Sequence, residues 1–257
     1  MTIAGSDSGA GAGIQADLKT FAAFQVYGTS AITAITAQNT RGVTRIEDLS
    51  VEIIRAQIDA ILSDIGAGAV KTGMLSSSAI IEGVAERLSS HGVTQLVVDP
   101  VMVAKGGDRL LREDAVDALR RLLLPLALVV TPNAGEAEVL SGRPVTSLEE
   151  AREAARAIYS LGPRYVVVKG GHFGRDATDV LFDGTEFTEL RADRIDTTST
   201  HGTGCTFASA IAAGLAHGNA VETAVANAKE YVNASIFEAF PVGAGHGPLN
   251  HFHALWR

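Results

Sequence analysis

A glycine-rich segment that ends in the single cysteine of the chain has the residue types needed to hold and transfer a phosphoryl group. Gly202 and Gly204 flank Thr203 just before an apolar helical pattern, so backbone N–H groups should be free at the start of a helix. Such a turn, together with the helix dipole, suits the oxygens of a transferring phosphoryl group. We therefore predict that Gly202, Thr203 and Gly204 form an anion-binding turn.

Cys205 follows this turn and falls in the first turn of the predicted helix. A thiol at that position typically has a lowered pKa, and a partly ionised thiolate could remove a proton from a substrate hydroxyl group. The alternative is that Cys205 is a small buried hydrophobic residue, as lone cysteines usually are. Position alone leaves both interpretations open.

Charged and polar residues at the ends of three other apolar runs are candidates for binding phosphate and metal. Asp99 and Lys169 each end such a run, and the segment from Thr131 through Asn133 to Glu136 follows a third. A lysine suits phosphate, and carboxylates such as Asp99 and Glu136 could hold Mg²⁺ through water. The alternatives are solvated strand ends, and a helix cap made by Asn133 and Glu136.

A second glycine-rich loop, from Ala4 to Gly13, precedes a helical pattern near the beginning of the chain. It is not a Walker A loop, because Ile14 follows where lysine would be required. It also lacks the acid that a dinucleotide-binding motif needs about 20 residues further on. We predict either a loop that approaches a ligand closely or a flexible N-terminal loop, after a short first strand.

The elements that must position these residues alternate between short apolar runs and amphipathic helical patterns. Strands are expected at 29–37, 69–71, 95–99, 127–131 and 165–169, and helices at 51–65, 80–88, 113–123, 134–141, 147–161, 205–217 and 220–239. Asp183 and Gly184 indicate a hairpin turn within 179–190. This order predicts one α/β domain over residues 1–257, with a mostly parallel sheet between two helical layers. The polar residues after the strands then converge at one sheet edge.

Composition narrows the class of protein further. The net charge of −8 leaves no basic stripe for general nucleic-acid binding. One cysteine excludes an intrachain disulfide and a zinc site built on several thiolates. The densest apolar run, 122–130, contains a proline and is too short to span a bilayer, and the N-terminus has no pattern of a secretory leader. We expect a cytoplasmic protein that does not bind membranes.

Several motifs occur in a consistent order along the chain. They are Ala4-Gly5-Ser6-Asp7-Ser8-Gly9, Gly11-Ala12-Gly13-Ile14-Gln15-Ala16-Asp17, Thr36-Ala37-Gln38-Asn39-Thr40, Lys71-Thr72-Gly73-Met74-Leu75, Asp99-Pro100-Val101-Met102, Thr131-Pro132-Asn133-x-x-Glu136 and Thr200-His201-Gly202-Thr203-Gly204-Cys205-Thr206. Together they closely resemble the bacterial hydroxymethylpyrimidine/phosphomethylpyrimidine kinases of thiamine biosynthesis, from residue 2 to about residue 240. The resemblance implies a ribokinase-like fold, usually dimeric.

The resemblance also implies an activity and a role for each motif residue. With ATP and Mg²⁺, the hydroxymethyl group of 4-amino-5-hydroxymethyl-2-methylpyrimidine would become a phosphate and then a diphosphate. The matching substrate positions are Gly5, Asp17, Gln38 and Met74; the proposed catalytic base is Cys205, the anion hole is Gly202 to Gly204, and the Mg-ATP contacts are Asp99, Thr131, Asn133, Glu136 and Lys169. A pyridoxine or pyridoxal kinase, and a non-catalytic pyrimidine-binding protein, are the alternatives.

Overall fold

The computed structural model describes residues 1–102, 113–170 and 176–255. Within these residues, nine strands form one sheet in the order β3-β2-β1-β4-β5-β6-β7-β8-β9. Their bounds are β1 (Thr2–Asp7), β2 (Ser30–Asn39), β3 (Gly42–Asp48), β4 (Val70–Thr72), β5 (Leu96–Val98), β6 (Val129–Val130), β7 (Tyr165–Val168), β8 (Asp179–Phe182) and β9 (Phe187–Leu190). The strands from β2 to β7 in this order are parallel, whereas β3, β8 and β9 pair antiparallel at the two edges.

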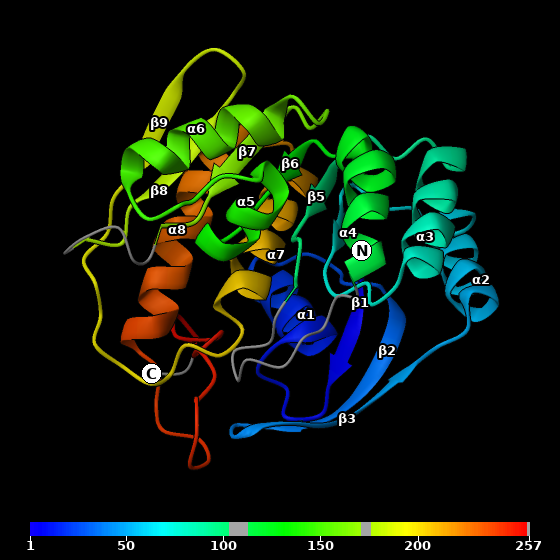
Figure 1. Cartoon of the computed structure of the whole chain (residues 1–257). Helices are drawn as coiled ribbons and strands as arrows, with labels where there is room; N and C mark the ends of the chain where they lie inside the picture. Colours follow the sequence, from blue (N-terminus) through cyan, green and yellow to red (C-terminus); the bar gives the residue numbers. More distant parts are fainter. Residues whose placement is uncertain (103–112, 171–175, 256–257) are drawn as a thin grey trace.

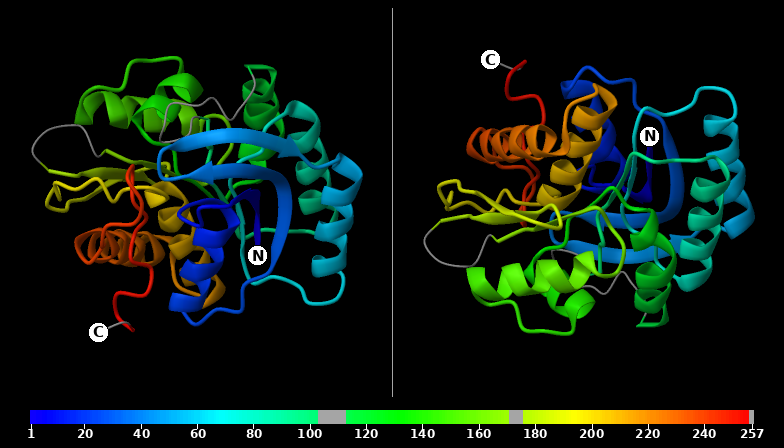
Figure 2. Two further views of the ribbon diagram at one scale, coloured as in Figure 1. Left: turned by 90° about the horizontal axis from the view of Figure 1, so that it is seen from below. Right: turned by 90° about the horizontal axis from the view of Figure 1, so that it is seen from above.

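Eight α-helices cover the sheet within the described residues, as Figure 1 shows. They are α1 (Gly13–Ala23), α2 (Val51–Leu62), α3 (Ser78–Ser90), α4 (Glu113–Ala118), α5 (Ala134–Ser141), α6 (Leu148–Tyr159), α7 (Thr203–Ala216) and α8 (Val221–Phe237). Helices α1, α7 and α8 lie on one face and α2 to α6 on the other (Figure 2). The three-layer α/β/α architecture predicted from the sequence is confirmed.

The central strands are buried on both faces, which explains why both faces need a helical layer. Val98 and Val166 pack into the core under α2 to α6, while Val97 and Val167 pack under α1, α7 and α8. Because successive strand residues point to opposite faces, a run that is apolar throughout must be covered on both sides. The short valine-rich strands therefore specify the middle layer.

Two predicted elements differ in the structure. Strand β2 extends to Asn39 and turns into β3 (Gly42–Asp48), a strand that the sequence did not predict. The predicted helix at 113–123 is α-helical only to Ala118 and continues as a π-helical turn at Leu119–Leu123. The Asp183–Gly184 turn joins β8 to β9 as predicted. Over the described ranges, no helix is both long and apolar enough to cross a membrane.

Candidate active site

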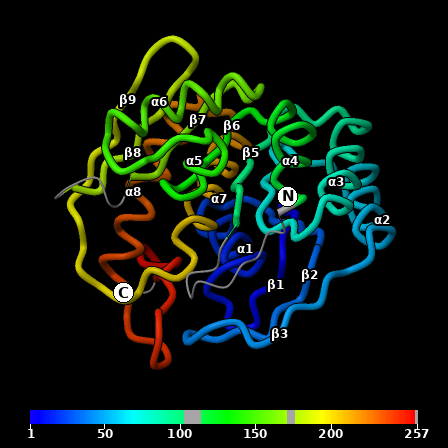
Figure 3. Tube along the Cα trace, viewed as in Figure 1, coloured from blue at the N-terminus to red at the C-terminus, as the bar shows by residue number. Residues whose placement is uncertain are grey.

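A cavity of about 800 Å³ lies beyond the carboxyl ends of the parallel strands. Its walls come from the loop after β1, the ends of β2, β5 and β7, and the start of α7. Figure 3 traces the backbone of these segments. Eleven of the thirteen site residues predicted from the sequence line this one cavity: Gly5, Gln38, Met74, Asp99, Asn133, Glu136, Lys169, Gly202, Thr203, Gly204 and Cys205. The two that do not are Asp17 and Thr131, which lie beneath it.

The start of α7 depends on a glycine at its N-cap. Gly202 has φ of 83°, and a Cβ there would lie 1.8 Å from the carbonyl oxygen of Gly11. Only glycine adopts this conformation at such a close approach between two loops. Thr203 and Gly204 line the cavity, and the first-turn N–H groups of an α-helix have no intrahelical partner. The Thr203 N–H makes a long hydrogen bond to the Thr200 carbonyl at 3.4 Å. The glycine turn at the start of a helix is as predicted, and anion binding by it stays a prediction.

Cys205 lies in the first turn of α7, but the prediction that its pKa is lowered is wrong. Burial raises the pKa of the thiol to about 11. The positive charge of Lys71 and a hydrogen bond from the Gly13 backbone act in the opposite direction, whereas the Asp17 and Asp99 carboxylates add to the increase. The helix N-terminus favours a thiolate, but loss of water contact at the cavity floor outweighs that effect.

Asp99, Lys169 and Glu136 form a compact charged group on one wall. Lys169 Nζ donates to Asp99 Oδ1 at 3.0 Å, and both side chains are largely buried. Burial acts to lower the pKa of Lys169, but the carboxylates of Asp99 and Glu136 hold it above its usual value. Burial raises the pKa of Glu136 to about 7, against the effect of Lys169. The Lys169 ammonium can contact phosphate oxygens, and the two carboxylates can hold a metal ion.

Glu136 caps α5, so the alternative interpretation of this segment as a helix cap is confirmed, and metal binding by Glu136 stays a prediction. The Asn133 side chain accepts a hydrogen bond from the Glu136 N–H at 2.9 Å, and the Glu136 carboxylate accepts one from the Asn133 N–H at 2.8 Å. The capping box fixes the carboxylate at the cavity wall. Thr131 is fully buried, with its Oγ1 3.4 Å from Asp99 Oδ1, and does not line the cavity.

These residues fit a Mg²⁺ ion held partly through water. Asp99 and Glu136 supply the hard oxygen ligands that Mg²⁺ prefers. No group of three or more His, Cys, Asp or Glu residues able to hold a metal is found in the part of the chain that the structure describes. A two-carboxylate site that relies on water and substrate phosphates matches the usual way in which proteins bind this ion.

The opposite end of the cavity holds Gly5, Gln38 and Met74. A Cβ at Gly5 would lie 2.6 Å from Met74 Cε, so the glycine leaves room for the methionine side chain. The Gln38 N–H donates to Ser8 Oγ at 2.8 Å, which ties β2 to the glycine-rich loop. An amide beside an apolar side chain suits a flat, polar-edged ring.

Asp17 does not contact the cavity, although the resemblance placed it in the substrate loop. Lys71 Nζ lies 2.9 Å from both of its carboxylate oxygens, and both side chains are completely buried. Thr2 Oγ1 and Ser209 Oγ also donate to it, at 2.6 and 2.7 Å. Asp17 thus joins β1, β4 and α7 beneath the site.

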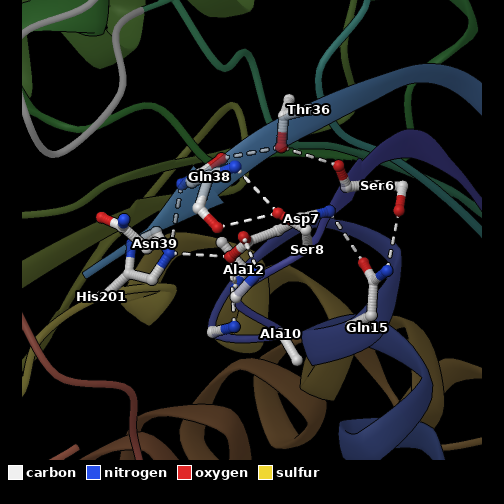
Figure 4. A network of polar contacts seen from close by, with 12 residues as sticks. Ser6, Asp7, Ser8, Ala10, Ala12, Gln15, Thr36, Gln38, Asn39 and His201 are labelled. Carbon is white, nitrogen blue, oxygen red and sulfur yellow. Dashed lines mark hydrogen bonds and ion pairs between the residues drawn. The ribbon is translucent and has the colours of Figure 1, made fainter. Parts of the chain in front are cut away.

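Asp7 and His201 are site residues to which the sequence analysis gave no role. Both line the cavity, and His201 Nε2 lies 2.8 Å from Asp7 Oδ2 (Figure 4). Their adjacency joins the glycine-rich loop to the segment before α7 across 194 residues of sequence. Each belongs to a motif quoted above, which was the available signal, but their pairing depends on the fold.

The C-terminal segment also contributes, although the sequence gave it no chemistry. His246 lines the cavity, and the Gly247 carbonyl accepts a hydrogen bond from the His201 N–H at 3.0 Å. At the cavity end near β8, Asp179 accepts hydrogen bonds from Lys229 Nζ at 2.8 Å and from the Gly170 N–H at 2.9 Å. These contacts close the side of the cavity that faces α8.

The parallel sheet, the anion-binding turn of α7 and the charged group at Asp99 define a small-molecule kinase of the ribokinase-like fold. Residues 7–250 match the family described as phosphomethylpyrimidine kinase. The chain is 55% identical over 261 residues to a hydroxymethylpyrimidine/phosphomethylpyrimidine kinase of Rhizobium meliloti, covering 100% of this chain and 98% of the relative. The chain therefore belongs to the phosphomethylpyrimidine kinase family.

Solved structures of pyridoxal kinases are also similar. An ADP complex of the Bacillus subtilis enzyme has a TM-score of 0.93 and 43% identity, covering 100% of this chain and 98% of that chain. The Staphylococcus aureus enzyme with AMP-PCP and pyridoxal has a TM-score of 0.92 and 37% identity, covering 99% of this chain and 93% of that chain. Similarity in this fold thus extends over kinases named for two different rings.

Proposed function

We propose that this protein uses ATP to phosphorylate 4-amino-5-hydroxymethyl-2-methylpyrimidine and then extends the monophosphate to the diphosphate. The observation that carries the proposal is a single cavity with Gln38 and Met74 at one end, the Asp99–Lys169 pair at the other and Cys205 on the wall of α7. Family membership and the named Rhizobium meliloti relative support the same substrate. An ADP complex and an AMP-PCP complex of similar kinases support ATP as the donor.

In the first step, the hydroxymethyl oxygen of the substrate attacks the γ-phosphorus of ATP. The new O–P bond forms as the bond to the β,γ-bridging oxygen breaks, ADP leaves, and the hydroxyl proton passes to Cys205 in its thiolate form. The N–H groups of the turn from Gly202 to Gly204 and the Lys169 ammonium stabilise charge on the transferring group. Mg²⁺, held by Asp99 and Glu136 through water, would neutralise charge on the ATP phosphates.

The second step makes a different demand on Cys205. Its nucleophile is the phosphate already added, which is anionic near neutral pH and needs no base to remove a hydroxyl proton. We expect Cys205→Ala to lower the rate of the first phosphorylation more than that of the second. Rates that fall equally in both steps would reject Cys205 as the base.

The decisive experiment is incubation of the purified chain with Mg-ATP and either hydroxymethylpyrimidine or pyridoxine, with products identified by mass. Successive pyrimidine mono- and diphosphates are the expected result, and a chelator of divalent cations should abolish both. Pyridoxine phosphate without any pyrimidine product would favour the second candidate, a pyridoxal-type kinase, which the solved neighbours make a specific alternative. Binding of the pyrimidine without any turnover of Mg-ATP would indicate a non-catalytic protein.

We further propose that the enzyme is a cytoplasmic homodimer. Ile35 on β2 and Ile46 on β3 are 51% and 36% exposed. They pair with Glu47 and Thr36 respectively, so their side chains lie on opposite faces of the sheet near its open edge. An edge strand with unpaired backbone groups and exposed apolar residues beside it suits pairing with a second copy of the chain. The free thiol of Cys205 and the use of ATP suit a reducing cytoplasm. Sedimentation analysis of the native chain and of Ile35→Asp tests the dimer.

A further inference from the structure

Asp7 is an anionic acceptor at the centre of the glycine-rich loop. Its Oδ1 accepts the Gly9 N–H at 2.8 Å, and its Oδ2 accepts the N–H groups of Gly11 at 3.1 Å and Ala12 at 2.9 Å. Burial acts to raise the pKa of Asp7, but the hydrogen bonds from His201, Gly9 and Ala12 outweigh it and hold the pKa below its usual value. A carboxylate accepts and does not donate, so His201 Nε2 must carry the proton between them.

The protonated Nε2 of His201 determines what can face it on its other side. The amide nitrogen of Gln38 lies 3.3 Å from His201 Nε2 as drawn in Figure 4, which sets one donor against another. The Nε2 proton is donated to Asp7 Oδ2, so Nε2 has no lone pair left to accept an amide N–H. Rotating the amide by 180° places Gln38 Oε1 there instead, where it can share this proton in a three-centre hydrogen bond. The neutral Nε2–H tautomer and the imidazolium both carry this proton, so the preference holds in either state.

The contacts at the other end of the amide give the same orientation. Thr36 Oγ1 lies 2.9 Å from the Ser6 carbonyl oxygen and 3.1 Å from the nearer amide atom of Gln38. A hydroxyl has one hydrogen, and the Ser6 carbonyl can only accept it, so Thr36 has lone pairs left for Gln38. The rotated amide donates an N–H to them. We propose that His201, held by Asp7, is a positioning residue that fixes Gln38 with its oxygen toward His201 and its nitrogen toward Thr36.

This fixed orientation gives the site a means of ring selection, and the argument here rests on the proposed pyrimidine substrate. A 4-aminopyrimidine presents an amino N–H donor next to a ring-nitrogen acceptor. That pair matches an amide oxygen beside an amide N–H. The 4-oxo counterpart presents a carbonyl acceptor next to a ring N–H, which is the inverted pattern. With Gln38 unable to rotate, the 4-oxo ring meets acceptor against acceptor and donor against donor.

Comparison of the 4-amino substrate with its 4-oxo analogue tests the inference. The measurement is the ratio of kcat/KM for the two rings, which is independent of the fraction of enzyme that is folded. The native enzyme should prefer the amino ring by at least about 100-fold. In His201→Phe, which keeps a ring but has no N–H, the amide can rotate and the preference should fall by about 10- to 100-fold. Asp7→Asn should shift the ratio in the same direction.

Three outcomes separate the possibilities. A ratio unchanged in an active His201→Phe enzyme overturns the positioning role. A native enzyme that phosphorylates pyridoxine and neither pyrimidine overturns the proposed function and, with it, the selectivity argument. If neither variant folds, long-range ¹H–¹⁵N correlation of the histidine rings in the native protein decides, because a His201 with unprotonated Nε2 overturns the orientation and a protonated Nε2 supports it.

Discussion

Replacing Lys71 by methionine should destabilise the protein severely, although the residue does not line the cavity. The substitution removes the positive member of an ion pair in which Lys71 and Asp17 are both 0% exposed and lie 2.9 Å apart. A buried charge left without its partner costs about 3–5 kcal/mol, a large share of the roughly 5–15 kcal/mol that stabilises a typical domain. Thr2 and Ser209 still donate to Asp17 but do not neutralise it.

Urea unfolding followed by circular dichroism gives the free energy of unfolding for each variant. The matched control is Arg45→Met, which breaks an exposed pair with Glu47 at 3.8 Å and should leave stability unchanged. The double variant Asp17→Leu with Lys71→Met should regain much of the loss, since it leaves no unpaired charge. A loss below about 1 kcal/mol in Lys71→Met would refute the reasoning, because that is the size expected of an exposed pair. An Asp17→Asn variant with native stability and a raised KM would instead restore Asp17 as a substrate contact.

Three other predictions concern single residues. Because the pKa of Cys205 is raised to about 11, its thiolate fraction should rise about tenfold per pH unit from pH 7 to 9. The rate of the first phosphorylation should rise with it, whereas the rate of the second should not. A first-step rate that does not change with pH would exclude the thiolate as the base. Gly202→Ala should abolish activity, because its Cβ would lie 1.8 Å from a carbonyl oxygen. Gly92 also has a positive φ but has open space around it, so the control Gly92→Ala should cost only about 1 kcal/mol of stability and leave turnover intact. Equal activity in both variants would contradict this prediction. Burial lowers the pKa of His251 to about 4, so the unfolded chain binds a proton near pH 6.5 before the folded chain does. Stability is therefore full above pH 6.5 and falls by about 3 kcal/mol on acidification toward pH 4; urea unfolding of His251→Leu should show a shallower acid loss, and an unchanged slope would contradict the assignment.

The fold could be predicted wherever burial left a pattern in the sequence. The strands from β4 to β7 are short and apolar, and their neighbours are amphipathic helices, so their order was readable. Strand β3 could not be predicted from the sequence, because it has no buried face: Thr44, Arg45, Ile46 and Glu47 are all exposed. It is a strand because β2 supplies its hydrogen-bonding partner. Pairing of that kind is a property of the folded sheet and leaves little trace in local composition.

The site was predictable to the extent that strand ends and glycine turns determine it. Asp17 could have been assigned correctly, since it lies with Ile14, Leu18 and Phe21 on the apolar face of α1 and an acid on that face must be buried. The raised pKa of Cys205 could not have been predicted, because it is caused by burial of the thiol in the folded protein and not by its place in the helix. The pairing of Asp7 with His201 likewise depends on two loops meeting across the sheet.

That meeting of distant loops has a consequence for how the chain reaches its native state on the ribosome. At typical rates of synthesis, 194 residues separate Asp7 from His201 by roughly 10–40 s. During that interval β1 can pair with β2 and β4, and Ser8 can bond to Gln38, but the contact of the glycine-rich loop with His201 cannot form. Gly11 cannot pack against Gly202, and Asp17 cannot accept its hydrogen bond from Ser209, until α7 has been synthesised. The catalytic centre therefore cannot be completed before α7 has been synthesised, and a nascent chain that ends before α7 is inactive however much of its sheet has folded.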